Sequence, residues 1–271
     1  MEKREVIDLL AKFVPRTTLF FDVIAAEHCN LNCKGCGSMS PLAEEKFLDL
    51  NVYENDLRRL SELSGGVMHH INILGGEPLL HTEIKKIIKI TRKYFNYGNI
   101  YLVTNGILLP KMDDEFWLIC KENDVIVAPT KYPVRLDYDE IEKKAKKFQV
   151  KYKYYGNVEK YGWDHTIIDI DGNRNEHTSF MWCDNANMCP TLIDGKIFPC
   201  PKPRNYKNFN KAFGTNLRLM DTDYIDIYNI ESIKEIFDFL AKPIPFCRYC
   251  NMYAKSKTDW GISKKEIGKW T

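Results

Sequence analysis

Apolar and polar positions along residues 19–155 switch repeatedly between a strand pattern and a helix pattern. Short apolar runs predict buried strands at 19–26, 70–74, 99–104, 125–130 and 150–155. Amphipathic stretches predict helices at 5–13, 51–63, 82–95, 113–123 and 137–148. Because strands that alternate with helices pair in parallel, this part of the chain predicts an α/β fold built on a parallel sheet.

The alternation stops near residue 156. Residues 162–178 are rich in turn-forming residues and predict a loop. Residues 191–201 predict a hairpin that turns at Asp194-Gly195. One further amphipathic stretch predicts a helix over 231–242.

Length sets the number of domains, and charge and hydropathy argue against nucleic-acid and membrane partners. The 271 residues suffice for a parallel α/β domain over 1–160 and a small α+β extension over 161–271. Lys and Arg number 39 against 37 Asp and Glu, so the formal charge of +2 does not indicate a nucleic-acid partner. No apolar run has the length of a membrane span or the form of a signal peptide, so we expect a cytoplasmic protein without a membrane partner.

Cysteines carry the strongest chemical signal. Thiols stay reduced in the cytoplasm, so the nine cysteines are expected to be metal ligands or reactive groups. Cys29, Cys33 and Cys36 lie in CNLNCKGC, directly after the first predicted strand. Three thiolates on a [4Fe–4S] cluster leave one iron open to another ligand. Thiolates also bind zinc, with His28 or His81 as the remaining ligand, and the spacing alone leaves both readings open.

Polar motifs follow the next three predicted strands: Gly75-Gly76-Glu77-Pro78, Thr104-Asn105 and Thr130. The carboxyl ends of strands in a parallel barrel share one rim, so these motifs are expected to converge with the cysteine loop. A glycine pair lets backbone approach a ligand closely, and Glu77 offers an acceptor for a cation. An ordinary turn is the alternative reading of these motifs.

The pair of motifs CNLNCKGC and LGGEPLL resembles the radical S-adenosylmethionine (SAM) superfamily. The resemblance implies a partial (β/α)6 TIM-type barrel in which Cys29, Cys33 and Cys36 bind a [4Fe–4S] cluster whose open iron binds SAM. An electron from a donor such as flavodoxin or ferredoxin then cleaves SAM to a 5′-deoxyadenosyl radical, which abstracts hydrogen from a substrate. The cofactor-binding residues that the resemblance implies are Gly75, Gly76, Glu77, Thr104, Asn105 and Thr130.

One position departs from the pattern of that superfamily. Its members usually carry an aromatic residue directly before the third cysteine, where this chain has Gly35. A side chain that packs on the adenine ring is therefore missing at this position, and Met39 and Phe47 are the candidate replacements.

The C-terminal cysteines form a second group, made of Cys183, Cys189, Cys200, Cys247 and Cys250. The group resembles the SPASM/twitch extension of radical SAM enzymes, which implies one auxiliary [4Fe–4S] cluster. Family spacing selects Cys183, Cys200, Cys247 and Cys250, with Cys189 as the alternative to Cys183. A structural zinc site is the other reading, and Cys120 is expected to be a packing residue.

These resemblances imply a radical SAM oxidoreductase. An auxiliary cluster can accept an electron from a substrate radical, which favours net oxidation (dehydrogenation) of a small carbohydrate or aminocyclitol-like molecule. A radical SAM epimerase, a peptide-modifying maturase and a zinc-bearing binding module are the alternatives. Candidate substrate contacts are His70, Lys131, Tyr132, Asp169 and Arg204.

Overall fold

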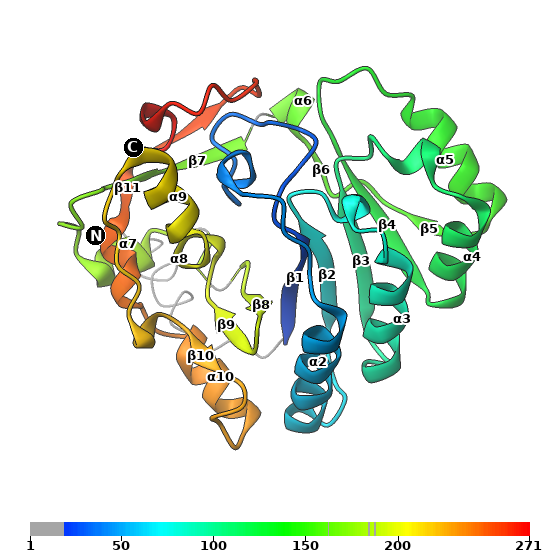
Figure 1. The fold of residues 1–271 in the computed structure, drawn as a ribbon, viewed down its shortest axis with the longest axis horizontal. Helices are drawn as coiled ribbons and strands as arrows, with labels where there is room; N and C mark the ends of the chain where they lie inside the picture. The colour runs from blue at the N-terminus through cyan, green and yellow to red at the C-terminus, as the bar shows by residue number, and fades with distance from the viewer. Residues whose placement is uncertain (1–18, 162, 184, 187) are drawn as a thin grey trace, which may run out of the picture.

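A mostly parallel sheet forms the centre of the protein (Figure 1). The computed structural model describes residues 19–271 except 162, 184 and 187, so the predicted helix at 5–13 lies outside the described residues. The strand order is β10-β9-β8-β1-β2-β3-β4-β5, and β6 also pairs with β4. Pairing is parallel from β8 to β5 and antiparallel between β8, β9 and β10. The predicted α/β class with a parallel sheet is confirmed.

The strands of this sheet are β1 (Phe20–Ala26), β2 (His70–Gly75), β3 (Asn99–Thr104), β4 (Val125–Lys131), β5 (Lys151–Tyr152), β6 (Gly156–Asn157), β8 (Thr191–Ile193), β9 (Lys196–Phe198) and β10 (Ile225–Asp226). The first four predicted strands are confirmed. The strand predicted over 150–155 is wrong in extent, because β5 ends at Tyr152, although the Lys153 and Tyr155 amides still donate to the Val127 and Pro129 carbonyls of β4.

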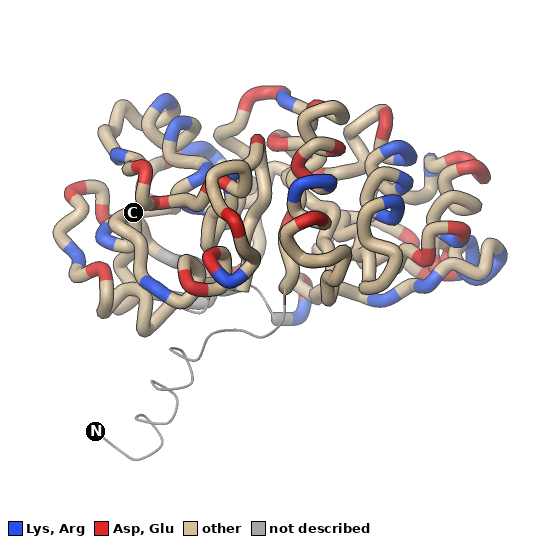
Figure 2. The backbone as a smooth tube through the Cα atoms, turned by 90° about the horizontal axis from the view of Figure 1, so that it is seen from below, with Lys and Arg blue, Asp and Glu red and all other residues tan. Residues whose placement is uncertain are grey.

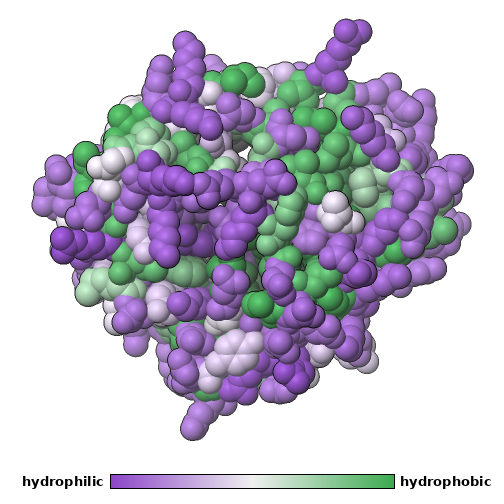
Figure 3. Space-filling view, in the orientation of Figure 1, coloured by the Kyte–Doolittle hydropathy of each residue, from purple (hydrophilic) through white to green (hydrophobic). Residues whose placement is uncertain are grey.

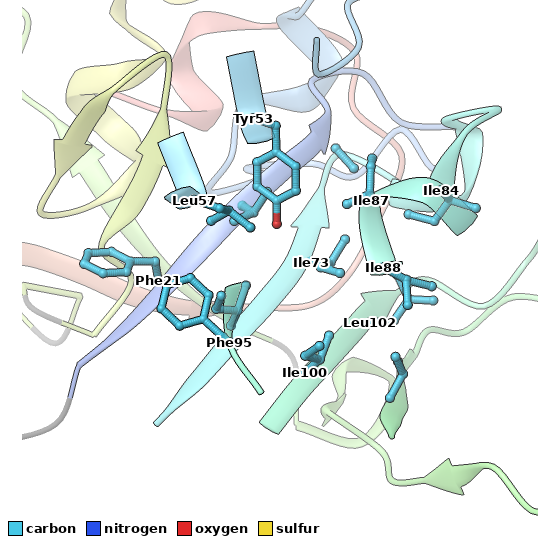
Figure 4. Packing of buried hydrophobic residues seen from close by; sticks show 14 of the residues in the cluster. Phe21, Tyr53, Leu57, Ile73, Ile84, Ile87, Ile88, Phe95, Ile100 and Leu102 are labelled. Carbon is cyan, nitrogen blue, oxygen red and sulfur yellow. The ribbon is translucent and has the colours of Figure 1, made fainter. Parts of the chain in front are cut away.

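Four helices follow β1 to β4 and cover one side of the sheet, as predicted: α2 (Leu50–Ser64), α3 (Ile84–Tyr94), α4 (Asp114–Glu122) and α5 (Tyr138–Lys147). Asp49, Asp113 and Asp137 begin α2, α4 and α5 by accepting hydrogen bonds from amides of the first turn. Figure 4 shows side chains of α2 and α3, among them Tyr53 and Ile87, packed with strand residues in one buried cluster.

The outer surface is polar and mixed in charge. Basic and acidic residues are interspersed along the outer helices (Figure 2). The face shown in Figure 3 is mainly hydrophilic, with apolar residues in smaller groups between polar ones. In the part of the chain that the structure describes, no helix combines the length and apolar character that a membrane crossing requires.

The C-terminal third differs most from the prediction. The segment 162–178, predicted as a loop, contains β7 (Trp163–Ile168) and the start of α7 (Glu176–Met181). The prediction was wrong because β7 pairs antiparallel with β11 (Cys250–Thr258), a partner far away in the sequence. The hairpin at Asp194-Gly195 is confirmed, and the helix predicted over 231–242 is α10 (Ile233–Leu240). The remaining helices are α6 (Val158–Tyr161), α8 (Pro201–Arg204) and α9 (Tyr206–Phe213).

The hairpin β8–β9 extends the central sheet. β8 pairs in parallel with β1, with Asp22 opposite Thr191 and Val23 opposite Leu192. Asp56 of α2 secures the turn, because its carboxylate accepts hydrogen bonds from the Gly195 amide at 2.8 Å and from the Tyr228 hydroxyl at 2.7 Å. The sheet thus continues past residue 160, and the domain boundary expected there remains a prediction.

Candidate active site

One cavity of about 320 Å³ receives the residues that follow the parallel strands. We call it the main cavity. The sequence-predicted residues that line it are Cys29, Cys33, Cys36, Gly75, Gly76, Thr104, Asn105, Thr130, Cys189 and Cys200. Motifs that lie far apart in the sequence are therefore brought together at the carboxyl ends of β1 to β4, as the parallel sheet predicts.

The cysteine loop after β1 places all three cysteines on the main cavity, with Cys33 buried and Cys29 and Cys36 half-buried. The Leu31 amide donates to Cys29 Sγ at 3.3 Å, and Asn105 Nδ2 donates to the same sulfur at 3.6 Å. Burial, with a smaller contribution from the neighbouring thiols, raises the pKa of Cys29 and of Cys33 to about 12. Thiolates in this loop therefore need a positive charge among them, as a bound metal centre provides.

The glycine pair fits β2 closely against the start of the cysteine loop. A Cβ on Gly75 would lie 2.2 Å from the Ala26 carbonyl oxygen, and a Cβ on Gly76 would lie 2.1 Å from that of His28. Gly75 also has a φ of +152°. Backbone atoms at the end of β1 therefore exclude any larger residue at these two positions. Both glycines also line the main cavity.

Glu77 lies behind the cavity wall, not on it. Its Oε1 accepts hydrogen bonds from Thr104 Oγ1 at 2.7 Å and the Leu79 amide at 3.0 Å, and its Oε2 accepts one from the Asn105 amide at 2.8 Å. Burial raises the pKa of Glu77 to about 7, although these three hydrogen bonds lower it. The carboxyl group thus holds Thr104 and Asn105, which do line the cavity.

A smaller second cavity gathers four of the C-terminal cysteines: Cys183, Cys200, Cys247 and Cys250. Burial, together with the neighbouring thiols, raises the pKa of Cys200 and Cys247, and burial raises that of Cys250 to about 11. Cys189 lines the main cavity instead, and Cys200 lines both. The structure therefore separates the two alternatives that the sequence left open, Cys183 and Cys189, into different cavities.

All nine cysteines are thiols without disulfide bonds. Cys120 is fully buried in the helix-covered core, as predicted. Across residues 19–271, apart from 162, 184 and 187, no three His, Cys, Asp or Glu side chains are arranged around a site for a single metal ion.

The predicted substrate contacts are mostly elsewhere. Tyr132 lines the main cavity. His70 lies at the opposite end of β2 and stacks on Phe20, Asp169 pairs with Arg174, and Lys131 lies over the rings of Tyr138 and Tyr154. Arg204 is buried and 4.0 Å from Glu27.

Neither candidate for the missing aromatic contact lines the main cavity. Met39 is buried in the C-terminal core, and Phe47 packs edge-on against His28 and His81. Gly35 has a φ of +64°, which disfavours a side chain at this position. Trp260 of the C-terminal segment does not line the main cavity either, but its Nε1 donates to Cys33 Sγ at 3.2 Å.

Sequence reasoning missed several residues of the cavity. Asp22, Tyr155, Asn185, Thr191 and Lys202 line it as well. Asp22 had a local signal, because it is the one charged residue in the apolar run LFFDVIAA. Tyr155 and Thr191 lie in a predicted strand and a predicted hairpin, but no local pattern marked them or Asn185 and Lys202 as cavity residues, and only the tertiary fold places them here.

Comparisons with known proteins agree with this geometry. Residues 23–128 match the model of the radical SAM superfamily. The GTP 3',8-cyclase of Chlorobaculum tepidum is 29% identical over 99 residues, which cover 36% of this chain and 29% of that enzyme. The GTP 3',8-cyclase of Clostridium acetobutylicum is 34% identical over 95 residues, which cover 34% of this chain and 29% of that enzyme. This chain thus matches less than a third of the length of either relative.

A solved structure extends the similarity in fold over most of the chain. The crystal structure of BtrN in complex with AdoMet and 2-DOIA aligns with a TM-score of 0.55 at 17% identity. The alignment covers 88% of this chain and 94% of BtrN, and it shows a shared fold. The matched segment 23–128 carries the cysteine loop, the GGEP turn and most of the parallel strands β1 to β4, and it is similar to the radical SAM superfamily.

Proposed function

We propose that this chain is a radical SAM enzyme whose [4Fe–4S] cluster is held by Cys29, Cys33 and Cys36. The observation that carries the proposal is that these three thiols share one cavity with the GGEP glycines and with the ends of β3 and β4. When bound, the cluster and SAM supply a 5′-deoxyadenosyl radical that abstracts hydrogen from a substrate. This arrangement favours an enzyme over a zinc-bearing binding module, which needs no such convergence.

The proposed SAM-binding residues are Gly75, Gly76, Glu77, Thr104, Asn105 and Thr130. Glu77 acts indirectly in this proposal, because its carboxylate positions the Thr104 hydroxyl and the Asn105 amide. The external electron donor is a small redox protein such as flavodoxin or ferredoxin, and the compartment is the cytoplasm, where the thiols stay reduced.

The proposed C-terminal extension over 161–271 holds an auxiliary [4Fe–4S] cluster through Cys183, Cys200, Cys247 and Cys250. Support comes from their shared second cavity. Cys200 also lines the main cavity, so the auxiliary cluster would lie directly beside the space available to a substrate. This position suits a one-electron acceptor and favours net dehydrogenation of a small carbohydrate or aminocyclitol-like molecule.

The charge of the main cavity argues against a nucleoside triphosphate, the substrate class that the name GTP 3',8-cyclase indicates for those relatives. Of its described lining residues, Lys202 is the one Lys or Arg, and Asp22 contributes a carboxyl group. A triphosphate needs several positive partners, and Arg, Lys or Mg²⁺ normally supply them. A weakly charged, hydroxyl-bearing substrate fits this lining better.

Epimerisation is the second candidate reaction, and the position of Cys189 favours it. Its thiol lines the main cavity, where a hydrogen atom could be returned to a substrate radical. Deuterium from solvent would then enter the product of the unmodified enzyme, whereas a dehydrogenated product carries two fewer hydrogens. Peptide modification remains a further alternative for the same radical chemistry.

The first prediction tests the cluster that binds SAM. Anaerobically reconstituted protein is expected to contain about eight iron atoms per chain, and changing Cys29, Cys33 and Cys36 together to alanine is expected to leave about four. SAM cleavage should be abolished, because the remaining cluster has no open iron. Iron analysis and chromatography of 5′-deoxyadenosine measure both effects, and full SAM cleavage by the triple variant would contradict the proposal.

The second prediction concerns Glu77→Gln. An amide replaces one acceptor oxygen by an NH₂ group that must face a hydrogen-bond donor, so Thr104 and Asn105 are expected to lose their positions. SAM affinity should fall about 10- to 100-fold, the usual effect of losing a charge-assisted hydrogen bond, while the cluster spectrum is retained. Glu83→Gln, at an exposed ion pair with Lys86, is the matched control. Equal SAM affinity in both variants and the unmodified protein would show that Glu77 does not support this site.

The third prediction separates Cys183 from Cys189. Cys183→Ala is expected to lose or distort the auxiliary cluster, because Cys183 lines the second cavity. Cys189→Ala is expected to retain it, because Cys189 lines the main cavity. Iron content and electron paramagnetic resonance report the outcome, and the opposite result would reverse the ligand assignment.

A further inference from the structure

Residues 260–263, which we call the strap, are hydrogen-bonded to the cysteine loop. The Lys34 amide donates to the Gly261 carbonyl at 2.7 Å, and the Ser263 amide donates to the Asn32 carbonyl at 2.8 Å. Asn32 Nδ2 in turn donates to the Ser263 carbonyl at 3.0 Å, across 231 residues of sequence. The strap is therefore joined to the loop on both sides of Cys33.

The strap brings an indole N–H group to a sulfur of the loop. Trp260 Nε1 donates to Cys33 Sγ at 3.2 Å, and Cys33 pairs with Ile262 in an isolated antiparallel bridge. The ring of Trp260 lies against Tyr132, with 6.5 Å between the ring centroids. Tyr132 lines the main cavity and Trp260 does not. Trp260 therefore reaches the proposed cluster site from outside the cavity.

The hydrogen bonds to Cys29 have a different origin. Cys29 Sγ accepts from the Leu31 amide within the loop and from Asn105 Nδ2, which follows β3. Both donors belong to the segment that matches the superfamily model, whereas the donor to Cys33 comes from the C-terminal segment. The strap thus adds a contact to the cysteine loop that residues 23–128 do not supply.

An indole N–H group is well suited to a thiolate ligand. It is only a donor and does not titrate, so its positive end faces the sulfur over the whole working pH range. Hydrogen bonds to the sulfurs are among the factors that set the reduction potential of an iron–sulfur cluster. A donor that points at a ligand sulfur favours the form with more negative charge, which is the reduced form. Packing alone does not require the N–H group, because a phenylalanine would also present a flat aromatic ring.

We infer that Trp260 is a positioning residue that raises the reduction potential of the proposed SAM-binding cluster through its hydrogen bond to Cys33. The electron comes from the external donor of the proposed function. The indole keeps its proton, so no covalent bond of Trp260 forms or breaks. The inference rests on the proposed function and deepens it, because Cys33 is a cluster ligand only under that proposal.

The test compares Trp260→Phe with the unmodified full-length holoenzyme. Both are titrated anaerobically with dithionite, and electron paramagnetic resonance follows the cluster whose signal changes when SAM is added, since a cluster held by four thiolates has no open iron. Trp260→Phe should make reduction about tenfold less favourable, which lowers the potential by ~59 mV for a one-electron couple. Iron content and SAM affinity should be retained, because Trp260 does not line the main cavity.

Trp270→Phe is the matched control. Trp270 also lies in the C-terminal segment and donates to the cysteine loop, but its Nε1 donates to the carbonyl oxygen of Cys36 at 3.4 Å and not to a sulfur. The same chemical change should therefore leave the potential of the SAM-binding cluster unchanged. An equal shift in both variants would show that Trp260 only supports the shape of the loop, and it would overturn the inference.

A second measurement does not depend on the folding of any variant. Unmodified holoenzyme is prepared with tryptophan that carries an isotope label at the indole nitrogen, and it is reduced with dithionite. Pulsed electron paramagnetic resonance should detect coupling between this nitrogen and the cluster that responds to SAM, because the hydrogen bond joins Trp260 to a ligand sulfur. The coupling should persist in Trp270→Phe and disappear in Trp260→Phe.

Equal potentials in Trp260→Phe and the unmodified enzyme would overturn the inference, and so would absence of the nitrogen coupling. SAM cleavage by the unmodified enzyme separates these outcomes from failure of the proposed function. An enzyme that cleaves SAM but gives either result refutes only the role of Trp260. An enzyme without a cluster that responds to SAM refutes the proposed function, and this inference with it.

Discussion

The parallel pairing of β8 with β1 is the contact on which both cavities depend. The Asp22 amide donates to the Pro190 carbonyl at 2.8 Å, and Asp22 and Val23 pair with Thr191 and Leu192. This short ladder puts Cys189, which comes just before β8, and Cys200, which follows β9, beside the cysteine loop that ends β1. One strand pair thus brings cysteines that lie more than 150 residues apart in the sequence to the same cavity.

The thiol and carboxyl groups in and beside the two cavities are buried, and burial disfavours their ionised forms. Burial raises the pKa of thiols in the main and second cavities and of the carboxyl groups of Glu77 and Asp22. Such groups cost stability unless a bound partner supplies opposite charge. Under the proposed function, the bound clusters would supply that charge, and folding of the C-terminal segment would be coupled to cluster binding.

Hydrogen bonds join the C-terminal segment to the cysteine loop. The Lys34 amide donates to the Gly261 carbonyl at 2.7 Å, and the Ser263 amide donates to the Asn32 carbonyl at 2.8 Å. These contacts bring Trp260 to Cys33. Gly35, in the same loop, has a left-handed backbone conformation. Hydrogen bonds to sulfur are among the factors that set the potential of an iron–sulfur cluster, so this contact is relevant to the proposed chemistry.

The sequence by itself determined the parts of the protein that depend on near neighbours. Apolar runs and helical periodicity predict β1 to β4 and α2 to α5, and the motifs at Cys29 and Gly75 predict one rim of converging residues. Only the tertiary structure decided the pairing of β7 with β11, the separation of Cys183 from Cys189, the position of Glu77 behind the cavity wall and the place of Asp22 on the main cavity. The physical reason is that local patterns report which face of an element is buried, whereas strand partners and cavity walls depend on contacts between segments that are distant in the sequence.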